Sequence, residues 1–128
     1  MLGLPTETTE DLEGIAALGK TVVEEYYHNP NRQKGKSVGV TLSVAAFIPK
    51  PFTPFQWEKQ DTLETMCEKQ QMIKRAITDR KIRYHYHDAK VSRLEAVFAR
   101  GDRRLADTVV RAYRKGCMFD GWTEYFRE

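Results

Sequence analysis

The first apolar stripe along the chain lies between Thr8 and His28. Its members recur at three- and four-residue intervals: Leu12, Ile15, Ala16, Leu18, Val22, Val23 and Tyr26. This spacing predicts an amphipathic helix. Thr8 can accept hydrogen bonds from the free N–H groups at the helix start, and Asp11 stands where a capping box needs an acidic or amide side chain. The sequence Asn29-Pro30-Asn31 then ends the helix near His28.

Residues 37–48 alternate between β-branched or apolar residues and small ones. We expect a parallel strand over residues 38–48. One face carries Val38, Val40, Leu42 and Val44, and the other carries Gly39, Thr41, Ser43 and Ala45. The small face has two interpretations: in a barrel it makes room for a ligand, or a helix packs closely on it. Pro49 ends the strand, because proline has no N–H to donate to a neighbouring strand.

The segment that follows the strand is rich in prolines and aromatic residues: Phe47, Pro49, Pro51, Phe52, Pro54, Phe55 and Trp57. One interpretation is a peptide ligand for a partner domain, since proline-rich aromatic segments bind in grooves of such domains. We favour a lid that folds back over the strand end, because its prolines reduce the entropy cost of ordering it. Glu7 and the 47–57 loop would then face one cavity.

A second helical stripe runs to about Asp79 through Leu63, Met66, Cys67, Ile73 and Ile77. Asp61 and Glu64 have the spacing of a capping box at its start. Cys67 belongs to the stripe, so we expect a buried thiol that packs as a small apolar residue.

Residues 81–87 alternate with period two, which predicts a strand. Ile82, Tyr84 and Tyr86 lie opposite Arg83, His85 and His87. Two histidines on one face are too few to hold a metal, and the sequence offers no third ligand nearby. We therefore interpret this face as polar surface and assign no metal ligand.

The last part of the chain predicts helices over residues 91–100 and 103–115 and an amphipathic turn through Phe126. Gly101 suits a left-handed helix C-cap and Asp102 the next N-cap, and Gly116 suits a second left-handed cap. The whole pattern predicts an α/β fold with two to three parallel strands and about four helices. We expect residues 89–128 to form a helical C-terminal extension packed on residues 1–88, as a single folded unit.

The composition fits one globular domain of 128 residues, with 41% hydrophobic and 30% charged residues. A formal net charge of +3 is too small to indicate a nucleic-acid partner. Cys67 and Cys117 lack the spacing of a metal site. No apolar run reaches the roughly 20 residues that cross a bilayer, and no leader begins the chain. We expect a reduced, cytoplasmic protein without a membrane partner.

Four phrases carry a resemblance to a known family. They are Gly3-Leu4-Pro5-Thr6-Glu7-Thr8, residues 47–57 (FIPKPFTPFQW), residues 94–105 (LEAVFARGDRRL) and Phe119-Asp120-Gly121-Trp122. In this order they resemble radical S-adenosylmethionine (radical SAM) proteins, and most of all a bacterial branch of Fe-S oxidoreductases that often has a cobalamin-binding-like region upstream. The resemblance implies a partial (β/α) barrel in which a 4Fe-4S cluster cleaves SAM reductively to a 5'-deoxyadenosyl radical.

The family holds its cluster with three cysteines in a C-x-x-x-C-x-x-C loop, and this sequence has no such loop. The resemblance therefore implies that residues 1–88 are the C-terminal portion of the barrel. The cluster-binding half would be supplied by the remainder of the parent chain. The chain alone would hold neither SAM nor the 4Fe-4S cluster and would be catalytically inert, with no catalytic residue of its own.

The resemblance also implies which residues form the SAM and substrate rim. The opening turn would end the fifth barrel strand, and residues 38–48 would form the sixth. Gly3, Leu4 and Pro5 would bring backbone close to the adenosine. Glu7 would hold a polar group, and Phe47-Ile48 would pack on the adenine. Lys50 and His87 are candidate substrate contacts, or else solvated loop residues.

Two further expectations concern partners. A sheet fragment leaves an open edge, so we expect self-association through strand pairing or exchange between copies. The alternative to an enzyme fragment is a stand-alone interaction module that binds a protein or RNA partner through the proline-aromatic loop and basic helices.

Overall fold

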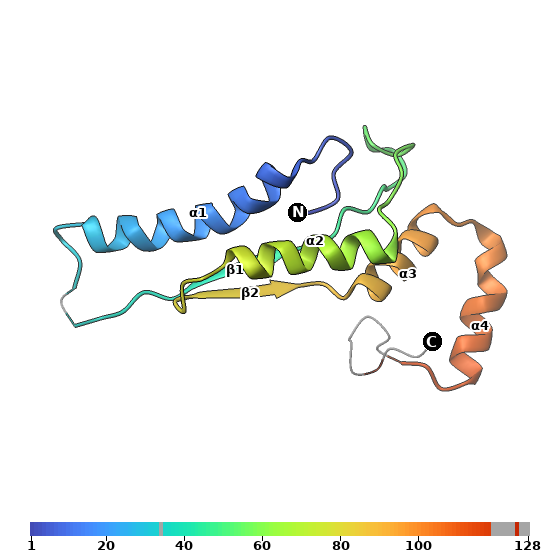
Figure 1. The fold of residues 1–128 in the computed structure, drawn as a ribbon. Coiled ribbons are helices and arrows are strands. Elements are labelled where there is room, and N and C mark those ends of the chain that lie inside the picture. Colours follow the sequence, from blue (N-terminus) through green and yellow to red (C-terminus); the bar gives the residue numbers. More distant parts are fainter. Residues whose placement is uncertain (34, 119–124, 126–128) are drawn as a thin grey trace.

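The computed structural model describes residues 1–33, 35–118 and 125 (Figure 1). The elements in chain order are α1 (Thr9–His28), β1 (Val40–Val44), α2 (Leu63–Ala76), β2 (Ile82–Tyr86), α3 (Ala89–Arg100), the short 3-10 helix η1 (Arg103–Leu105) and α4 (Ala106–Arg114). Within this part of the chain the predicted α/β class is confirmed, with four α-helices and a two-stranded parallel sheet.

The two strands pair in parallel with a register that runs from Val40 opposite Ile82 to Val44 opposite Tyr86. The start of the chain lies beside the end of β1, where Leu2 forms an isolated parallel bridge with Ala46. The Leu2 N–H donates to the Ala45 carbonyl at 3.0 Å, and the Phe47 N–H donates to the Leu2 carbonyl at 2.7 Å. The opening turn and the end of β1 therefore share one rim, as predicted.

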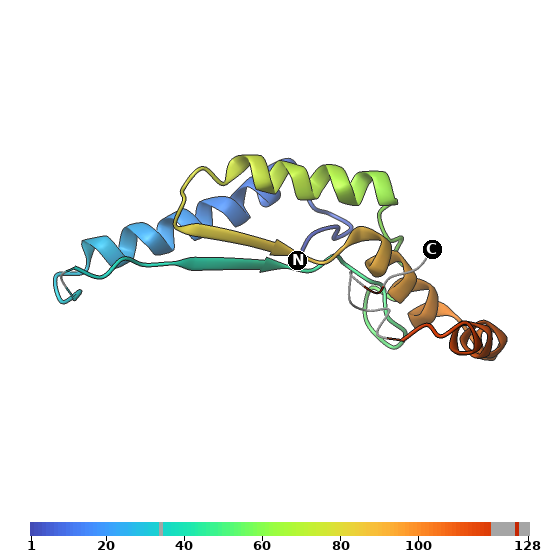
Figure 2. The same cartoon turned by 90° about the horizontal axis from the view of Figure 1, so that it is seen from below.

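One face of the sheet is covered and the other is open. Figures 1 and 2 together show α1 and α2 on the same side of β1 and β2. The core on this side is built from seven buried residues: Leu2, Leu12, Val44, Ala46, Met66, Ile73 and Ala89. On the opposite face Thr41, Ser43, Arg83 and His85 are exposed. The predicted alternation is confirmed along β1 and from Ile82 to His85 of β2, whereas Tyr86 is exposed. None of the described helices packs on the small-residue face.

Helix α1 begins as its sequence predicts. The Thr8 side chain accepts from the Asp11 N–H, while the Asp11 carboxylate accepts from the Thr8 N–H at 2.8 Å. Farther along, Gly19 is buried against the sheet, and a Cβ placed there would lie 3.0 Å from the nearer Leu42 methyl. The helix therefore approaches β1 more closely than a larger residue would permit.

Two predictions for α2 are wrong. The N-cap is Thr62, whose hydroxyl accepts from the Thr65 N–H at 3.2 Å; Asp61 instead pairs with Lys69. Cys67 is exposed, because the buried positions of this helix are Met66, Gln70 and Ile73. Being adjacent to Met66, Cys67 points away from that buried line.

Helix α3 is capped by Asp88 at its start and by Gly101 at its end. Asp88 caps α3 by accepting from Lys90 N–H and Val91 N–H at 2.8 and 3.1 Å. Gly101 has φ −77, so the left-handed cap predicted there is wrong. Glycine is needed there for space instead, since a Cβ would lie 2.8 Å from the Val97 carbonyl oxygen and would clash with Leu105.

The remaining predictions for this region have mixed outcomes. Asp102 is an N-cap, as predicted, and its carboxylate accepts from the Arg104 N–H at 2.9 Å. The predicted 103–115 helix is divided into η1 and α4. Gly116 adopts the predicted left-handed conformation, with φ +73. The phrase Phe119–Trp122 and the turn through Phe126 lie outside the described residues.

None of the described helices combines the length and apolar character that a membrane span requires.

The close approach of α1 predicts opposite effects for two glycines of one helix. Gly19→Leu should lower the free energy of unfolding by about 1–3 kcal/mol, because the added side chain overpacks against Leu42 and Ile82. Gly14→Leu should raise it by about 0.5–1 kcal/mol, because Gly14 has no neighbour within contact of a Cβ and leucine favours helix. Urea unfolding of both variants checks this; equal effects of the two substitutions would contradict the packing.

Candidate functional site

The Glu7 side chain closes the opening turn by hydrogen bonding to the backbone of Gly3. The Gly3 N–H donates to both Glu7 carboxylate oxygens, at 2.8 and 2.9 Å. Gly3 has φ +88, a left-handed conformation that glycine adopts without steric cost. A Cβ at this position would also lie 3.0 Å from an Asp61 carboxylate oxygen. Backbone conformation and close approach both require glycine here.

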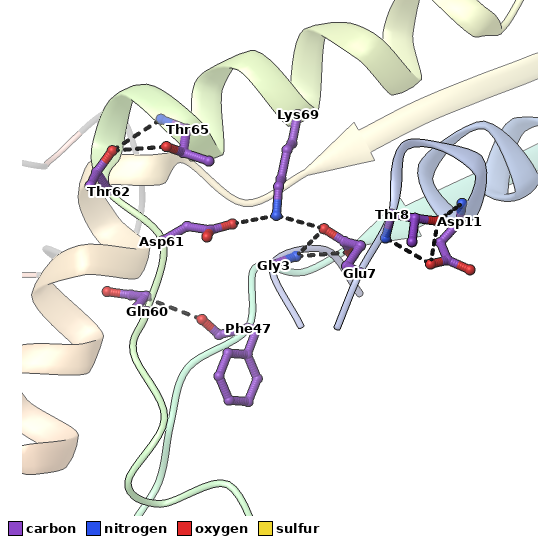
Figure 3. A network of polar contacts seen from close by, with 10 residues as sticks. All are labelled: Gly3, Glu7, Thr8, Asp11, Phe47, Gln60, Asp61, Thr62, Thr65 and Lys69. Carbon is purple, nitrogen blue, oxygen red and sulfur yellow. Dashed lines mark hydrogen bonds and ion pairs between the residues drawn. The ribbon is translucent and has the colours of Figure 1, made fainter. Parts of the chain in front are cut away.

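Lys69 of α2 joins the turn to the loop that precedes the helix. Its Nζ lies 2.9 Å from Glu7 Oε1 and 2.7 Å from Asp61 Oδ2 (Figure 3). The exposed fractions of the three side chains are 4% for Glu7, 19% for Lys69 and 24% for Asp61. We call Gly3, Glu7, Asp61 and Lys69 the rim network. It fixes the opening turn against the start of α2.

Two opposing effects act on the Lys69 ammonium. Burial disfavours its charge, but the hydrogen bonds and charges of Asp61 and Glu7 outweigh burial and raise the pKa of Lys69 above its ordinary value of 10.5. Lys69 is therefore charged at neutral pH, where its ammonium pairs with both carboxylates.

The residues assigned to SAM contacts lie in three different environments: exposed to solvent, enclosed in the rim network, and buried or half-buried beside it. Leu4 and Pro5 are exposed. Glu7 is enclosed by its two partners in the rim network. Phe47 is buried and Ile48 is half-buried, and a Cβ at Gly3 would lie 3.7 Å from the Phe47 Cβ. The opening turn and Phe47 are thus adjacent, while the assigned contacts with SAM stay predictions.

Lys50 and His87 have separate local roles. Lys50 Nζ lies 2.9 Å from Glu95 Oε1 of α3, and both side chains are about half exposed. The His87 carbonyl accepts a hydrogen bond of 2.8 Å from the buried Gln70 side chain, which leaves the exposed imidazole to solvent. Both imidazole and ammonium are accessible, and their assignment as substrate contacts stays a prediction.

The proline-aromatic loop presents its tip to solvent. Phe52 is 98% exposed and Trp57 is 84% exposed, so these rings do not cover the strand end and the lid interpretation is wrong for them. Phe55 stays near the base of the loop, edge to face with Phe47 at 6.0 Å between ring centres. Glu7 does not share a cavity with the loop tip, because Glu7 points into the rim network.

Polar contacts hold the base of this loop against α3. Besides Lys50–Glu95, Arg100 Nη1 donates to the Glu58 carbonyl at 3.1 Å. The Gln60 amide donates to the Ser92 carbonyl at 3.1 Å and to the Phe47 carbonyl at 3.4 Å. Sequence reasoning missed these contacts and the role of Lys69. No local pattern marks them, since they join residues far apart in the chain.

The donor set does not fit a 4Fe-4S cluster. Cys67 is on α2 and Cys117 follows α4, and cluster ligation needs more thiolates in close spacing. Among the described residues, no group of three or more His, Cys, Asp or Glu side chains is arranged to hold a metal ion.

Comparison with known proteins adds one relative of unknown activity. An uncharacterized protein of Methanocaldococcus jannaschii is 33% identical over 137 aligned positions, which cover 100% of this chain and 28% of the relative. The chain thus spans less than a third of that protein's length. No family model matches the chain. No solved structure matches it.

Loss of the Lys69 ammonium should destabilise the fold. In Lys69→Met the enclosed Glu7 carboxylate keeps the Gly3 N–H but has no cation, so the free energy of unfolding should fall by about 2–4 kcal/mol. Lys20→Met is the matched control, because Lys20 pairs with Glu24 on the exposed face of α1; it should change stability by less than about 0.5 kcal/mol. Chemical denaturation measures both, and equal losses would contradict the role of the rim network.

The raised pKa of Lys69 sets the pH range of this contribution. A lysine whose folded pKa exceeds its unfolded pKa stabilises the fold fully below the unfolded value, and this stabilisation is lost as pH rises through the folded value. The stability difference between wild type and Lys69→Met should therefore be constant from pH 7 to about 9.5 and shrink above about 10.5. Burial, with a smaller effect of Tyr86, raises the pKa of Tyr84 to about 12.

Tyr84 also destabilises the fold at alkaline pH, because its buried phenol ionises less readily than the unfolded one. The comparison removes this effect, since both proteins retain Tyr84. Denaturant unfolding in steps from pH 7 to 11.5 gives the difference at each pH. A difference that grows above pH 10 would contradict the assignment.

Proposed function

We propose that the chain is the C-terminal portion of a radical SAM Fe-S oxidoreductase barrel and contributes part of the SAM and substrate rim. The observation that carries the proposal is the common rim: the Leu2–Ala46 bridge sets the opening turn beside the end of β1, and β2 runs parallel to β1. In α/β barrels the sites lie at the carboxyl ends of the strands. The resemblance assigns the SAM contacts to that same end.

The two faces of the sheet suit this proposal. A barrel keeps its helices outside and its second strand face inside. Here α1 and α2 cover one face (Figure 2). The open face pairs Thr41 with Arg83 and Ser43 with His85, all four of them exposed. In the proposed parent these polar side chains would line the interior near the substrate.

Under this proposal the residues at the rim have three different roles: contact with SAM, positioning of the opening turn and contact with the substrate. Leu4 and Pro5 are accessible to adenosine. Phe47 and Ile48 are the apolar residues beside them. Glu7 acts as a positioning residue, because the Gly3 N–H and Lys69 already occupy its carboxylate. Lys50 and His87 remain accessible to a substrate.

The radical chemistry would belong to the cluster and SAM, which the remainder of the parent chain would hold. The chain by itself would be catalytically inert. The proposal locates the protein in the cytoplasm, where Cys67 and Cys117 stay reduced.

A second candidate, a binding module for a protein or RNA partner, is favoured by the exposure of Phe52 and Trp57. Aromatic rings on a loop held at its base can stack on bases or fill a partner's pocket. Filter binding to single-stranded RNA discriminates the two. Tight binding that weakens steeply with salt would favour the module over the enzyme fragment.

The enzyme proposal predicts the content and activity of the full open reading frame. A C-x-x-x-C-x-x-C loop should precede this sequence in the same frame or in a partner. The protein purified without oxygen should carry a 4Fe-4S cluster and convert SAM to 5'-deoxyadenosine when dithionite is added. An open reading frame without the three cysteines, and without a partner that has them, would overturn the proposal.

The rim assignment can be separated from the activity with one variant and its control. Leu4→Asn should raise the KM for SAM about tenfold by removing an apolar contact with adenosine. Leu18→Asn alters an exposed leucine of α1 and should leave the KM unchanged. Equal KM values for both variants would remove Leu4 from the SAM site and leave the enzyme class intact.

A further inference from the structure

A cleft of about 400 Å³ lies between the base of the proline-aromatic loop and α3. Pro49, Gln60, Asp61 and Thr62 line the loop side. Helix α3 lines the other side with Arg93, Ala96, Val97 and Arg100. The volume is within the range of small-molecule sites, about 300–1,000 Å³. Neither Glu7 nor the open sheet face borders this cleft, so it is separate from the proposed SAM contacts.

The α3 side has an ordered chemical pattern. Residues three, four and seven positions apart lie on one helix face, which places Arg93 and Arg100 on the same face with Ala96 and Val97 between them. At 1.5 Å rise per residue the two arginine backbones are about 10 Å apart along the helix. The α3 wall of the cleft therefore has an apolar centre and an arginine at each end. Pro49 lies on the loop side of the cleft.

Both arginines have guanidinium N–H donors that are available to a ligand. Arg93 is exposed and forms no hydrogen bond with the described residues, while its charge acts on the Glu64 carboxylate. Arg100, which also lines the cleft, donates one N–H to the Glu58 carbonyl. A guanidinium has five donors in a planar fork that fits a carboxylate or a phosphate. Four donors of Arg100 therefore remain for a ligand.

Two acidic groups bear on an anion in the cleft: Asp61, which lines it, and Glu64, on which the charge of Arg93 acts. Asp61 lines the cleft, but its carboxylate lies 2.7 Å from Lys69 Nζ. Glu64 lies in the first turn of α2, where its own backbone N–H, followed by Thr62 and more weakly by Arg93, lowers its pKa. The start of α2 at Thr62 adds the positive end of a helix dipole. An anion in the cleft thus meets two guanidinium groups, while the Asp61 carboxylate is paired with Lys69.

We propose that this cleft binds a small molecule with an oxyanion group, a carboxylate or a phosphate, on an apolar body. The Arg93 guanidinium holds the oxyanion, and the apolar body lies on Ala96 and Val97. The proposal does not depend on the enzyme proposal, because it uses none of the rim residues assigned to SAM.

The test is a titration of the ¹⁵N-labelled 128-residue chain followed by NMR. The probes are phenyl phosphate, phenylacetate, inorganic phosphate and benzyl alcohol. Phenyl phosphate or phenylacetate should cause saturable shifts at Gln60, Thr62 and residues 93–100. The tighter of the two should bind about tenfold more tightly than inorganic phosphate, which lacks the apolar body, and than benzyl alcohol, which lacks the charge. The tighter of the two aromatic anions identifies the oxyanion as a phosphate or a carboxylate, and either result supports the site.

Variants separate this site from general attraction to a basic protein. Arg93→Gln should weaken binding of the preferred probe about tenfold, and Arg93→Lys should have a smaller effect because it keeps the charge but loses the planar fork. Arg83→Gln removes the same charge from the exposed sheet face and should change affinity less than about twofold. Arg93 is exposed, so thermal unfolding of Arg93→Gln should match wild type.

Three results would overturn the proposal. The shifts could fail to saturate or spread over the basic surface. Arg83→Gln could weaken binding as much as Arg93→Gln. Benzyl alcohol could bind as tightly as the aromatic anions, which would make the cleft merely apolar.

Discussion

The ion pairs of Lys69 with Glu7 and Asp61 are the constraint on which the rest of the rim depends. The opening turn is attached at its start, through the buried Leu2 side chain and the Leu2–Ala46 bridge at the end of β1. Lys69 binds Glu7, and Glu7 binds the Gly3 N–H, so α2 holds the turn in place. Because Glu7 is almost fully enclosed, its charge needs a partner, and the cost of an unpaired buried carboxylate makes this geometry the favourable one.

Asp61 connects this network with the cleft at α3. The Asp61 carboxylate pairs with Lys69, and Asp61 lines the cleft together with Arg93 and Arg100. Residues 47–62 are therefore fastened twice, to α2 through Asp61 and to α3 through Lys50, Gln60 and the Glu58 carbonyl. With its base held in this way, the loop can present Phe52 and Trp57 to solvent without losing its position. The SAM rim proposed here and the oxyanion cleft are neighbours that share this support.

Local patterns in the sequence predicted what is local in the structure. The Thr8–Asp11 capping box, the alternation of β1 and of β2 as far as His85, and the left-handed Gly116 each depend on residues a few positions apart. Predictions failed where distant residues decide the outcome. Asp61 has the right spacing for a capping box, but Lys69 takes its carboxylate and Thr62 caps α2. Glycine is the residue type that a left-handed cap favours, but Leu105 packs against the backbone of Gly101 and the φ angle of Gly101 is negative. No periodicity predicts Lys69, whose partners come from the opening turn and a loop.

A double-mutant cycle of Glu7→Gln and Lys69→Met measures the central interaction most directly. The free energies of unfolding of wild type, both single variants and the double variant give the coupling between the two side chains. The rim network predicts a coupling of about 1–3 kcal/mol at pH 7. A coupling below about 0.3 kcal/mol would contradict the account, because Lys69 would then not hold the opening turn through Glu7.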